Sequence, residues 1–348
     1  MATVRGISSV TRPLHLTSID WNNTRDRTSV ASCLVEGVYK MEVDRQKNRS
    51  GPELQATIWW EMLHFSLLET LTNNDSDSSI YGAVFEYKYY NHQNIPGSTT
   101  PPRYVIAFRG TIPKSQTWFC DSALNLRIIF DSLHQGPRFT HAMHTIRNFV
   151  AKHNHTSVWL AGHSLGAGLA LLAGKTMAMS GFLLETYIFN PPVSSFPLET
   201  LIKSRVVKGG IKITGSLIKV GLAKIFKDLE EDDPSTNIAS WTPNLYVNPR
   251  DVICSEYIGY FKNKTFMSKI GLSEIERIAA KNPLRSLFVG KGGTSTPTDL
   301  SNEPLHLLPS AFMTVNTSGS QDRIKAHGLN QWWDPLFKGE YVLYQFSS

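Results

Sequence analysis

The chain has 348 residues, of which 41% are hydrophobic and 18% charged, and its formal net charge is +6. Such a chain can bury a large core in one or two domains. No window approaches the roughly 18 uninterrupted apolar residues of a transmembrane helix. Basic residues are not interleaved with aromatic ones in a repeated way, so we expect no nucleic-acid partner.

The cysteines indicate a reducing compartment. Cys33, Cys120 and Cys254 form an odd, widely spaced set, which is not a disulfide framework. None lies in a C-x-x-C pair or near a histidine cluster, so we expect neither a metal nor another cofactor. Residues 1–18 lack the apolar segment of a secretory signal. We therefore expect an intracellular, cytoplasmic protein.

The first part of the chain reads as helical, over residues 19–70. Apolar residues between 29 and 41 fall on one face of a helix. A second helix follows, and its Trp59 and Trp60 are expected to pack in the core rather than to bind a ligand.

Alternating apolar residues then predict strands at 80–90 and 104–108. Segment 112–138 has irregularly spaced aromatic and aliphatic residues. It is interpreted either as a lid over an apolar cleft or as an ordinary connecting helix. A helix predicted at 140–153 leads into the next strand.

The most informative stretch begins at residue 158. An apolar run ends in Gly-His-Ser-Leu-Gly, and a Gly-, Ala- and Leu-rich helical run follows from Leu165. This strand–turn–helix setting is that of a nucleophile elbow, with Ser164 as the nucleophile. Gly162 and Gly166 have no Cβ to collide where strand and helix cross.

Later elements are read in the same way. Strands are predicted at 185–189, 245–247 and 311–315, the last ending the sheet, and a helix within 271–283. Residues 193–240 form an inserted cap segment with basic and then acidic residues. Within it, 201–229 is interpreted as an insertion packed on the core with a solvated lysine face, or as a basic amphipathic helix on a lipid surface.

A serine nucleophile needs a base, usually histidine, which a carboxylate orients. In α/β-hydrolases these follow in the order serine, acid, histidine, each on a loop after a strand. His327 follows the strand at 311–315 and is the preferred base. His306 precedes that strand and is expected to be packed in the structure.

Asp251 is the preferred acid because it closely follows a strand and a proline-containing turn. Its alternative role is that of a turn residue binding nearby backbone N–H groups. Asp232 and Asp233 belong to a charge run that is expected to be solvated. Asp299 and Asp322 lie too near the last predicted strand to be the acid, which is expected second in the order serine, acid, histidine.

Ester chemistry also needs donors for the developing oxyanion. One is the N–H of Leu165, directly after the nucleophile, and the other is expected from the loop 108–111. There Gly110 allows close backbone approach, and Thr111 offers both an N–H and a hydroxyl. Arg109 is expected to brace the loop.

The sequence F-R-G-T at 108–111, followed by G-H-S-L-G-A at 162–167, resembles class-3 (fungal-type) triacylglycerol lipases. The chain as a whole resembles a plant group of lipase-like α/β-hydrolases, with matching stretches at 13–17, 255–261 and 327–333. Some members of that group are labelled GDSL esterase/lipase. This sequence contains no G-D-S-L, and its Gly-His-Ser-Leu-Gly elbow is typical of a different class of mechanism.

We expect a single α/β-hydrolase domain over 1–348, with a mostly parallel sheet covered by helices on both faces, N-terminal helices, and a helical insertion after the strand at 185–189. The resemblance implies a lid after the F-R-G-T loop. The site residues that it implies are the triad Ser164, Asp251 and His327, with Thr111 and Leu165 as oxyanion donors. The family's usual D-P-V-P around the acid is replaced here by N-P-R-D-V.

Together, these features predict a serine esterase or lipase. It would hydrolyse a small-molecule or lipid acyl ester through an acyl-enzyme. The alternatives are a catalytically silent lipase-like module for binding or signalling, and an acyltransferase. Acyl length, head group and oligomeric state stay open.

Overall fold

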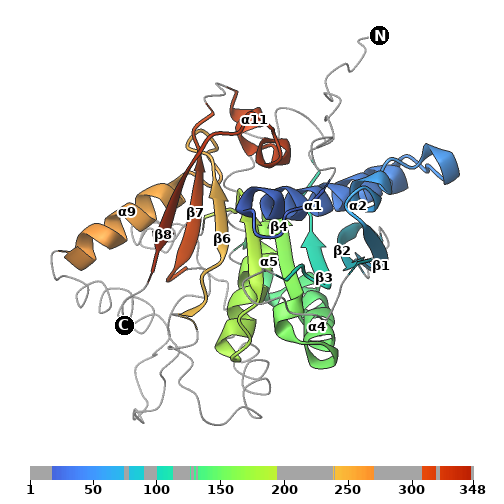
Figure 1. Cartoon of the computed structure of the whole chain (residues 1–348), viewed down its shortest axis with the longest axis horizontal. Coiled ribbons are helices and arrows are strands. Elements are labelled where there is room, and N and C mark those ends of the chain that lie inside the picture. The colour runs from blue at the N-terminus through green and yellow to red at the C-terminus, as the bar shows by residue number, and fades with distance from the viewer. Residues whose placement is uncertain are drawn as a thin grey trace, which may run out of the picture.

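The computed structural model describes residues 18–73, 78–89, 100–112, 126, 129–130, 132–193, 238, 240–269, 308–318 and 322–345. Within them, an eight-stranded sheet has its strands side by side in chain order, β1 to β8 (Figure 1). Strands β3 to β7 are parallel, and β1, β2 and β8 are antiparallel to their neighbours.

The element bounds are as follows. The strands are β1 (Phe65–Thr72), β2 (Ile80–Tyr87), β3 (Tyr104–Phe108), β4 (Val158–His163), β5 (Glu185–Phe189), β6 (Asn244–Val247), β7 (Ala311–Asn316) and β8 (Gly339–Tyr344). The α-helices are α1 (Thr24–Gln46), α2 (Ile58–Glu61), α4 (Pro137–Lys152), α5 (Leu165–Met179), α9 (Glu256–Lys269) and α11 (Arg323–His327). Short 3-10 turns are η1 (Gly51–Glu53), η2 (Leu133–Gln135), η3 (His155–Ser157) and η4 (Leu329–Trp332).

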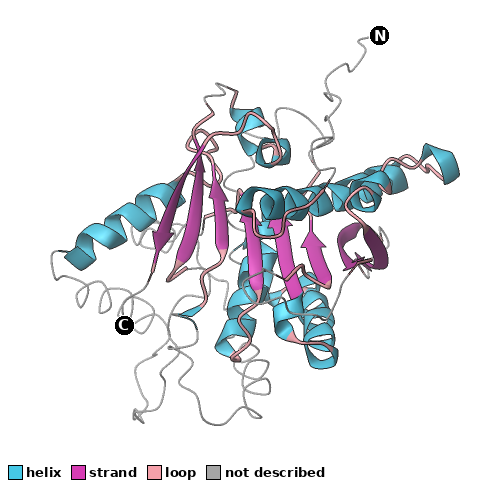
Figure 2. Cartoon of the chain, in the orientation of Figure 1, coloured by secondary structure: helices cyan, strands magenta, loops and turns pink. Residues whose placement is uncertain are grey.

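Helices cover both faces of the sheet (Figure 2). Successive side chains of a strand point to opposite faces. Ile106 and Leu160 therefore pack with α4 and α5 on one face, while Val105 and Trp159 pack with α1 and α2 on the other. All side chains of β3 and β4 are buried, which explains their continuous apolar runs. The architecture is that of an α/β-hydrolase fold.

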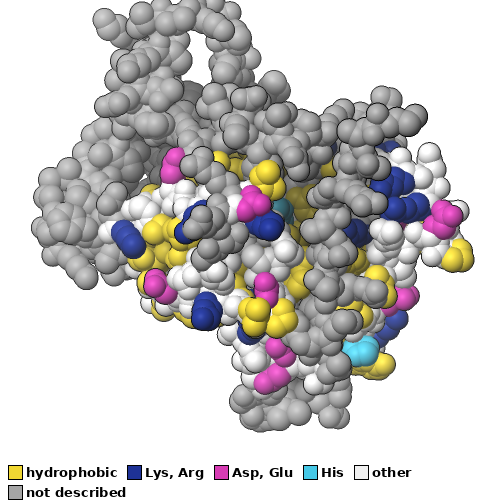
Figure 3. All heavy atoms as spheres, turned by 90° about the horizontal axis from the view of Figure 1, so that it is seen from above, with side chains coloured by type: hydrophobic (Ala, Val, Ile, Leu, Met, Phe, Trp, Pro, Cys, Tyr) yellow, Lys and Arg dark blue, Asp and Glu magenta, His cyan; other side chains and the backbone are white. Residues whose placement is uncertain are grey.

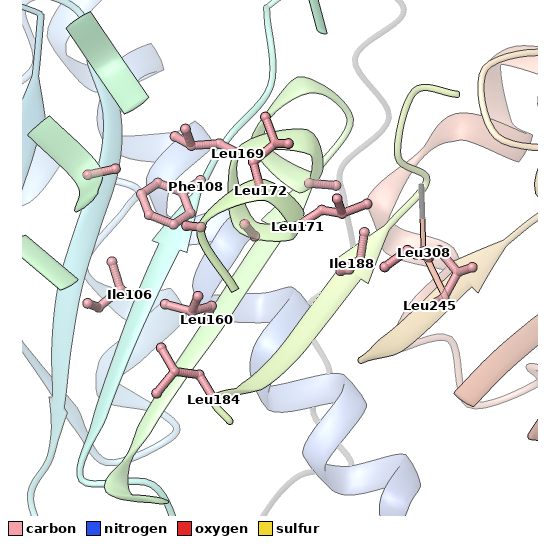
Figure 4. Packing of buried hydrophobic residues seen from close by; sticks show 14 of the residues in the cluster. Ile106, Phe108, Leu160, Leu169, Leu171, Leu172, Leu184, Ile188, Leu245 and Leu308 are labelled. Atoms are coloured by element: carbon pink, nitrogen blue, oxygen red, sulfur yellow. The ribbon is translucent and has the colours of Figure 1, made fainter. Parts of the chain in front are cut away.

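Many leucines contribute to the α5 face of the core (Figure 4). Leu169, Leu171 and Leu172 of α5 belong to one buried cluster with Phe108 and Ile188 of the sheet. Full burial of each such side chain stabilises the fold by about 2 kcal/mol. This packing holds α5 against the strands that precede and follow it.

The helical prediction for residues 19–70 is wrong in its last part. Helix α2 ends at Glu61, and residues 65–72 form β1, which pairs antiparallel with β2. The register shifts between Leu67 and Glu69, and such a bulge breaks the alternation that marks a strand. Only Phe65 and Leu71 are buried, so the sequence lacked a clear period of two.

The strand at 311–315 is not the last one. β8 follows and pairs antiparallel with β7 along its length. Most of its side chains are exposed, so main-chain hydrogen bonds rather than a buried apolar face define this edge strand.

Helix α9 was also not predicted. Its Tyr257 and Phe261 are buried in the core cluster on the α5 face.

The other predicted elements are confirmed. Helix α1, helix α4, the elbow strand and helix, and the strands β2, β3, β5, β6 and β7 lie where they were expected. Trp59 and Trp60 are buried, as predicted. No helix among the described residues is long and apolar enough to cross a membrane.

Several predictions concern parts of the chain outside the described residues. These include 113–125 of the expected lid, nearly all of the expected cap at 193–240 with its basic segment 201–229, and the predicted helix at 271–283. The rejected candidates His306, Asp232, Asp233 and Asp299 also lie there.

Candidate active site

Ser164 occupies the sharp turn between β4 and α5. Its backbone angles are φ 55° and ψ −124°, which L-residues rarely adopt. Its N–H donates to the carbonyl of Phe189 at 3.0 Å, which ties the turn to β5. The side chain makes no capping hydrogen bond to α5. The turn therefore holds the hydroxyl away from the helix that it begins.

The two glycines of the elbow are required by close backbone approach. A Cβ on Gly162 would lie 2.1 Å from the carbonyl oxygen of Gly166. A Cβ on Gly166 would lie 2.4 Å from the carbonyl oxygen of Phe108 in β3. Strand, turn and helix can cross this closely only without those side chains.

The predicted acid and base lie side by side. Asp251 follows β6, and His327 ends α11, which follows β7. The Nδ1–H of His327 donates to Oδ2 of Asp251 at 2.8 Å, and both residues are buried. Because a carboxylate only accepts, Nδ1 carries the hydrogen and Nε2 is left able to take a proton. His327 and Ser164 line the same cavity, of about 290 Å³.

Asp251 lies in a dense set of donors. Oδ2 also accepts from Nδ2 of Asn190 at 2.7 Å and from Sγ of Cys254 at 3.1 Å, while Oδ1 accepts from the N–H of Ile253 at 3.0 Å. Burial alone would raise the pKa of Asp251, but the facing His327 and these hydrogen bonds outweigh burial and lower it. The carboxylate is therefore ionised at neutral pH.

Asp322, which was considered as an alternative acid, has another role in the structure. Its Oδ1 accepts from the N–H of Ile324 at 2.9 Å, so it caps the N-terminus of α11. The cap stabilises the short helix that ends at His327.

The expected oxyanion loop lies against the elbow. A Cβ on Gly110 would lie 2.8 Å from Cβ of Ser164, and Thr111 lines the cavity. Leu165 is the first residue of α5, where a backbone N–H has no partner within the helix. Both expected donors therefore belong to segments that adjoin Ser164.

Arg109 braces this loop, as predicted. Its Nε donates to the carbonyl of Ile80 at 2.5 Å, and Nη1 donates to the carbonyl of Gly110 at 2.6 Å. Nη2 lies 3.7 Å from Oε1 of Glu42, a fully buried residue of α1. The guanidinium thus links the end of β3 to β2 and to α1.

Sequence reasoning missed the part that α1 plays at the site. The N–H of Gly110 donates to the hydroxyl of Tyr39 at 2.8 Å, and that hydroxyl donates to Nδ1 of His163 at 2.9 Å. Nε2–H of His163 in turn donates to the backbone carbonyl of His327 at 2.8 Å. A chain of hydrogen bonds therefore joins the expected oxyanion loop to the residue expected as the base. Tyr39 belongs to a helix far away in sequence, and no local pattern marked it.

Within this chain of hydrogen bonds, the imidazole of His163 is neutral. Burial lowers its pKa from 6.5 to about 3, and repulsion from the neighbouring His327 adds to the effect. The neutral ring must carry its hydrogen on Nε2 because the carbonyl of His327 only accepts.

The cavity has a mixed lining. Apolar side chains come from Val43, Ile112, Ile253, Ile324 and Leu329. Helix α1 adds Glu36 and Lys40, whose charged groups lie 3.3 Å apart. The face that carries α1 and α11 likewise shows acidic and basic side chains interspersed with hydrophobic ones (Figure 3). Among the described residues, no group of three or more histidine, cysteine or carboxylate side chains could hold a metal.

The chain is similar to known proteins of the lipase and esterase class. Residues 105–196 match the family model for lipase (class 3). A protein of Arabidopsis thaliana named GDSL esterase/lipase is 43% identical over 99% of both chains.

Two solved lipases share limited similarity. A propeptide complex of a Rhizomucor miehei lipase deletion mutant has a TM-score of 0.27 at 15% identity, covering 49% of this chain and 52% of that one. Serratia marcescens extracellular lipase LipA has a TM-score of 0.30 at 13% identity, covering 49% and 38%. At these scores the fold assignment rests on the sheet topology itself. On the near full-length match, the chain belongs to the plant family of class-3 lipase-like α/β-hydrolases that includes the Arabidopsis protein.

Proposed function

We propose that the protein is a serine esterase that hydrolyses a carboxylic ester of an acyl lipid. The observation that carries this proposal is the 2.8 Å hydrogen bond that Asp251 accepts from His327, which lines the same cavity as the strained Ser164. Membership of a lipase-like family supports a hydrolytic function.

In the acylation step, Oγ of Ser164 attacks the ester carbonyl carbon while Nε2 of His327 takes the hydroxyl proton. The C–O bond to the alcohol then breaks, and the imidazolium returns the proton to the leaving oxygen. Asp251 keeps the imidazole in the tautomer with Nδ1–H and stabilises the imidazolium.

The acyl group is now on Ser164, and water releases it. The water oxygen attacks the acyl carbon while His327 takes a proton from that water. The tetrahedral intermediate collapses, the proton returns to Oγ of Ser164, and the carboxylic acid leaves. In both steps the N–H groups of Thr111 and Leu165 are the proposed donors to the oxyanion. Loss of one such donor raises the barrier by about 3–4 kcal/mol.

The relative's name, GDSL esterase/lipase, supports an ester substrate but not a G-D-S-L mechanism. This chain has no G-D-S-L, and its serine lies in G-H-S-L-G between a strand and a helix. The elbow geometry therefore supports Ser164 as the nucleophile.

Labelling with a fluorophosphonate probe tests the proposal. We expect the wild type and a Ser180→Ala control, changed at the far end of α5, to be labelled and to hydrolyse p-nitrophenyl esters. Ser164→Ala should do neither. Labelling that persists in Ser164→Ala would exclude Ser164 as the nucleophile.

Absence of both labelling and turnover in the wild type would favour the silent module. An added alcohol distinguishes hydrolysis from acyl transfer. If ester formation exceeds acid release at low alcohol concentration, the protein is an acyltransferase. Varying the acyl length of the p-nitrophenyl esters then defines the preferred chain.

A further inference from the structure

Asn190 lies at the carboxyl end of β5, between the strand that carries the elbow and β6, which precedes Asp251. It is fully buried, and its φ of 47° is in the left-handed region. Asparagine tolerates this region better than most residues do. Its N–H donates to the carbonyl of Tyr246 at 2.9 Å, so its backbone is tied to β6.

The side chain of Asn190 makes three short hydrogen bonds to three separate segments, besides a longer one of 3.6 Å from Nδ2 to Sγ of Cys254. Nδ2 donates to Oδ2 of Asp251 at 2.7 Å and to the carbonyl oxygen of Ala326, next to His327, at 3.1 Å. Oδ1 accepts from the indole Nε1 of Trp332 at 2.7 Å. One buried amide therefore contacts the acid, the segment of the base, and the turn η4 that follows it.

The chemistry of the partners determines the orientation of this amide. A carboxylate and a backbone carbonyl only accept, and an indole N–H only donates. The amide nitrogen must therefore face Asp251 and Ala326, and the amide oxygen must face Trp332. An aspartate here would place a second carboxylate against Asp251, and a glycine would leave all three partners without this contact.

Trp332 anchors the arrangement from behind. Its side chain is fully buried, and its ring centroid lies 5.3 Å from that of Tyr246 and 6.3 Å from that of Phe189. The indole N–H thus has little freedom to follow a rotating amide. The amide Nδ2 of Asn190 is therefore held in place as a donor to Oδ2 of Asp251. The same oxygen accepts from Nδ1 of His327.

We infer that Asn190 is a positioning residue of the reaction, which holds the acid and the base segment in one geometry through its side-chain amide. This inference rests on the proposed function, because the acid and the base are those of the proposed triad. The acid and the base follow different strands, and the Asn190 amide contacts both segments in addition to the direct hydrogen bond between Asp251 and His327. A misplacement of about 1 Å costs roughly 100-fold in rate.

The decisive variant is Asn190→Gly, because glycine accepts the positive φ and removes the side chain with its amide. All rates are expressed per active site, counted by fluorophosphonate titration, so that a misfolded fraction does not enter. We expect kcat to fall roughly 10- to 100-fold with KM changed by less than about twofold. A purely structural role would lower the number of active sites and leave kcat per site unchanged.

A second variant, Asn190→Asp, keeps the shape and tolerates the positive φ, but places a second carboxyl group against Asp251 in place of a donor. Because two buried carboxyl groups at hydrogen-bond distance share a proton, we expect the pH profile of kcat/KM to gain an ionisation that the wild type lacks. A profile identical to that of the wild type would contradict the proximity that the inference requires.

Trp332→Phe tests the anchor, with Trp60→Phe as the matched control in another part of the core. Trp332→Phe should lower kcat in the same direction as Asn190→Gly but less, and the double variant should be no worse than Asn190→Gly alone. The inference is overturned if Asn190→Gly keeps kcat per site within about twofold of wild type, or if the two effects add. A wild type that is never labelled would instead overturn the proposed function.

Discussion

The neutral His163 makes folding stability depend on pH in a way that can be calculated. Its side chain is buried, with Nε2–H on the carbonyl of His327 and Nδ1 on the hydroxyl of Tyr39. Its pKa is about 3 in the folded protein, against an ordinary value of 6.5, and burial is the main cause. The unfolded chain therefore binds a proton at this position at pH values where the folded protein does not.

The sign follows from linkage. A histidine whose pKa is depressed on folding contributes its full stability above about pH 6.5, and this contribution is lost as the pH falls from about 6.5 towards 3. One pH unit corresponds to about 1.36 kcal/mol. A pH of about 5 lies about 1.5 units below the ordinary pKa of 6.5. At that pH the neutral His163 should therefore lower the free energy of unfolding by about 2 kcal/mol, relative to its value above pH 6.5.

Urea unfolding of the wild type and of His163→Gln, measured between about pH 7.5 and 5, tests this value. Like the histidine, glutamine can donate one hydrogen bond and accept another, but it does not titrate. The contributions of all other titrating groups to the unfolding free energy cancel when the two proteins are compared. We expect the wild type to lose about 2 kcal/mol more than the variant. His144→Gln, at an exposed position on α4, is the control and should follow the wild type. A difference below about 0.5 kcal/mol would refute a neutral, buried His163.

Three further predictions concern the site. Tyr39→Phe removes the hydroxyl that joins Gly110 of the proposed oxyanion loop to His163, and should lower the unfolding free energy by about 1–3 kcal/mol in urea; wild-type stability would contradict the hydrogen-bond chain. Ser164→Gly relieves the strained backbone angles, so its thermal midpoint should exceed that of Ser164→Ala although both lack activity. Asp251→Asn should reduce kcat by about 10⁴-fold in an ester assay, with the fold intact by circular dichroism, because the preferred tautomer of His327 is lost.

Much of the fold could be predicted because its central elements have local signals. The strand at 104–108 is a continuous apolar run and the strand at 185–189 ends in one, as expected for parallel strands buried on both faces. The edges of the sheet were harder to predict. The bulge in β1 and the exposed side chains of β8 leave no regular pattern, because edge strands are held mainly by main-chain pairing.

The sequence by itself determined the elbow, because its strand, turn and helix are adjacent in the chain. The proposed order serine, acid, histidine follows from the positions of these residues relative to the predicted strands. Only the tertiary structure decided which side chains meet. Sheet formation brings Asp251 within 2.8 Å of His327 across 76 positions, Tyr39 within 2.8 Å of the Gly110 amide across 71, and Asn190 within 2.7 Å of Asp251 across 61. Such contacts depend on the register of neighbouring strands and on the packing of α1, which have no periodic counterpart in the sequence.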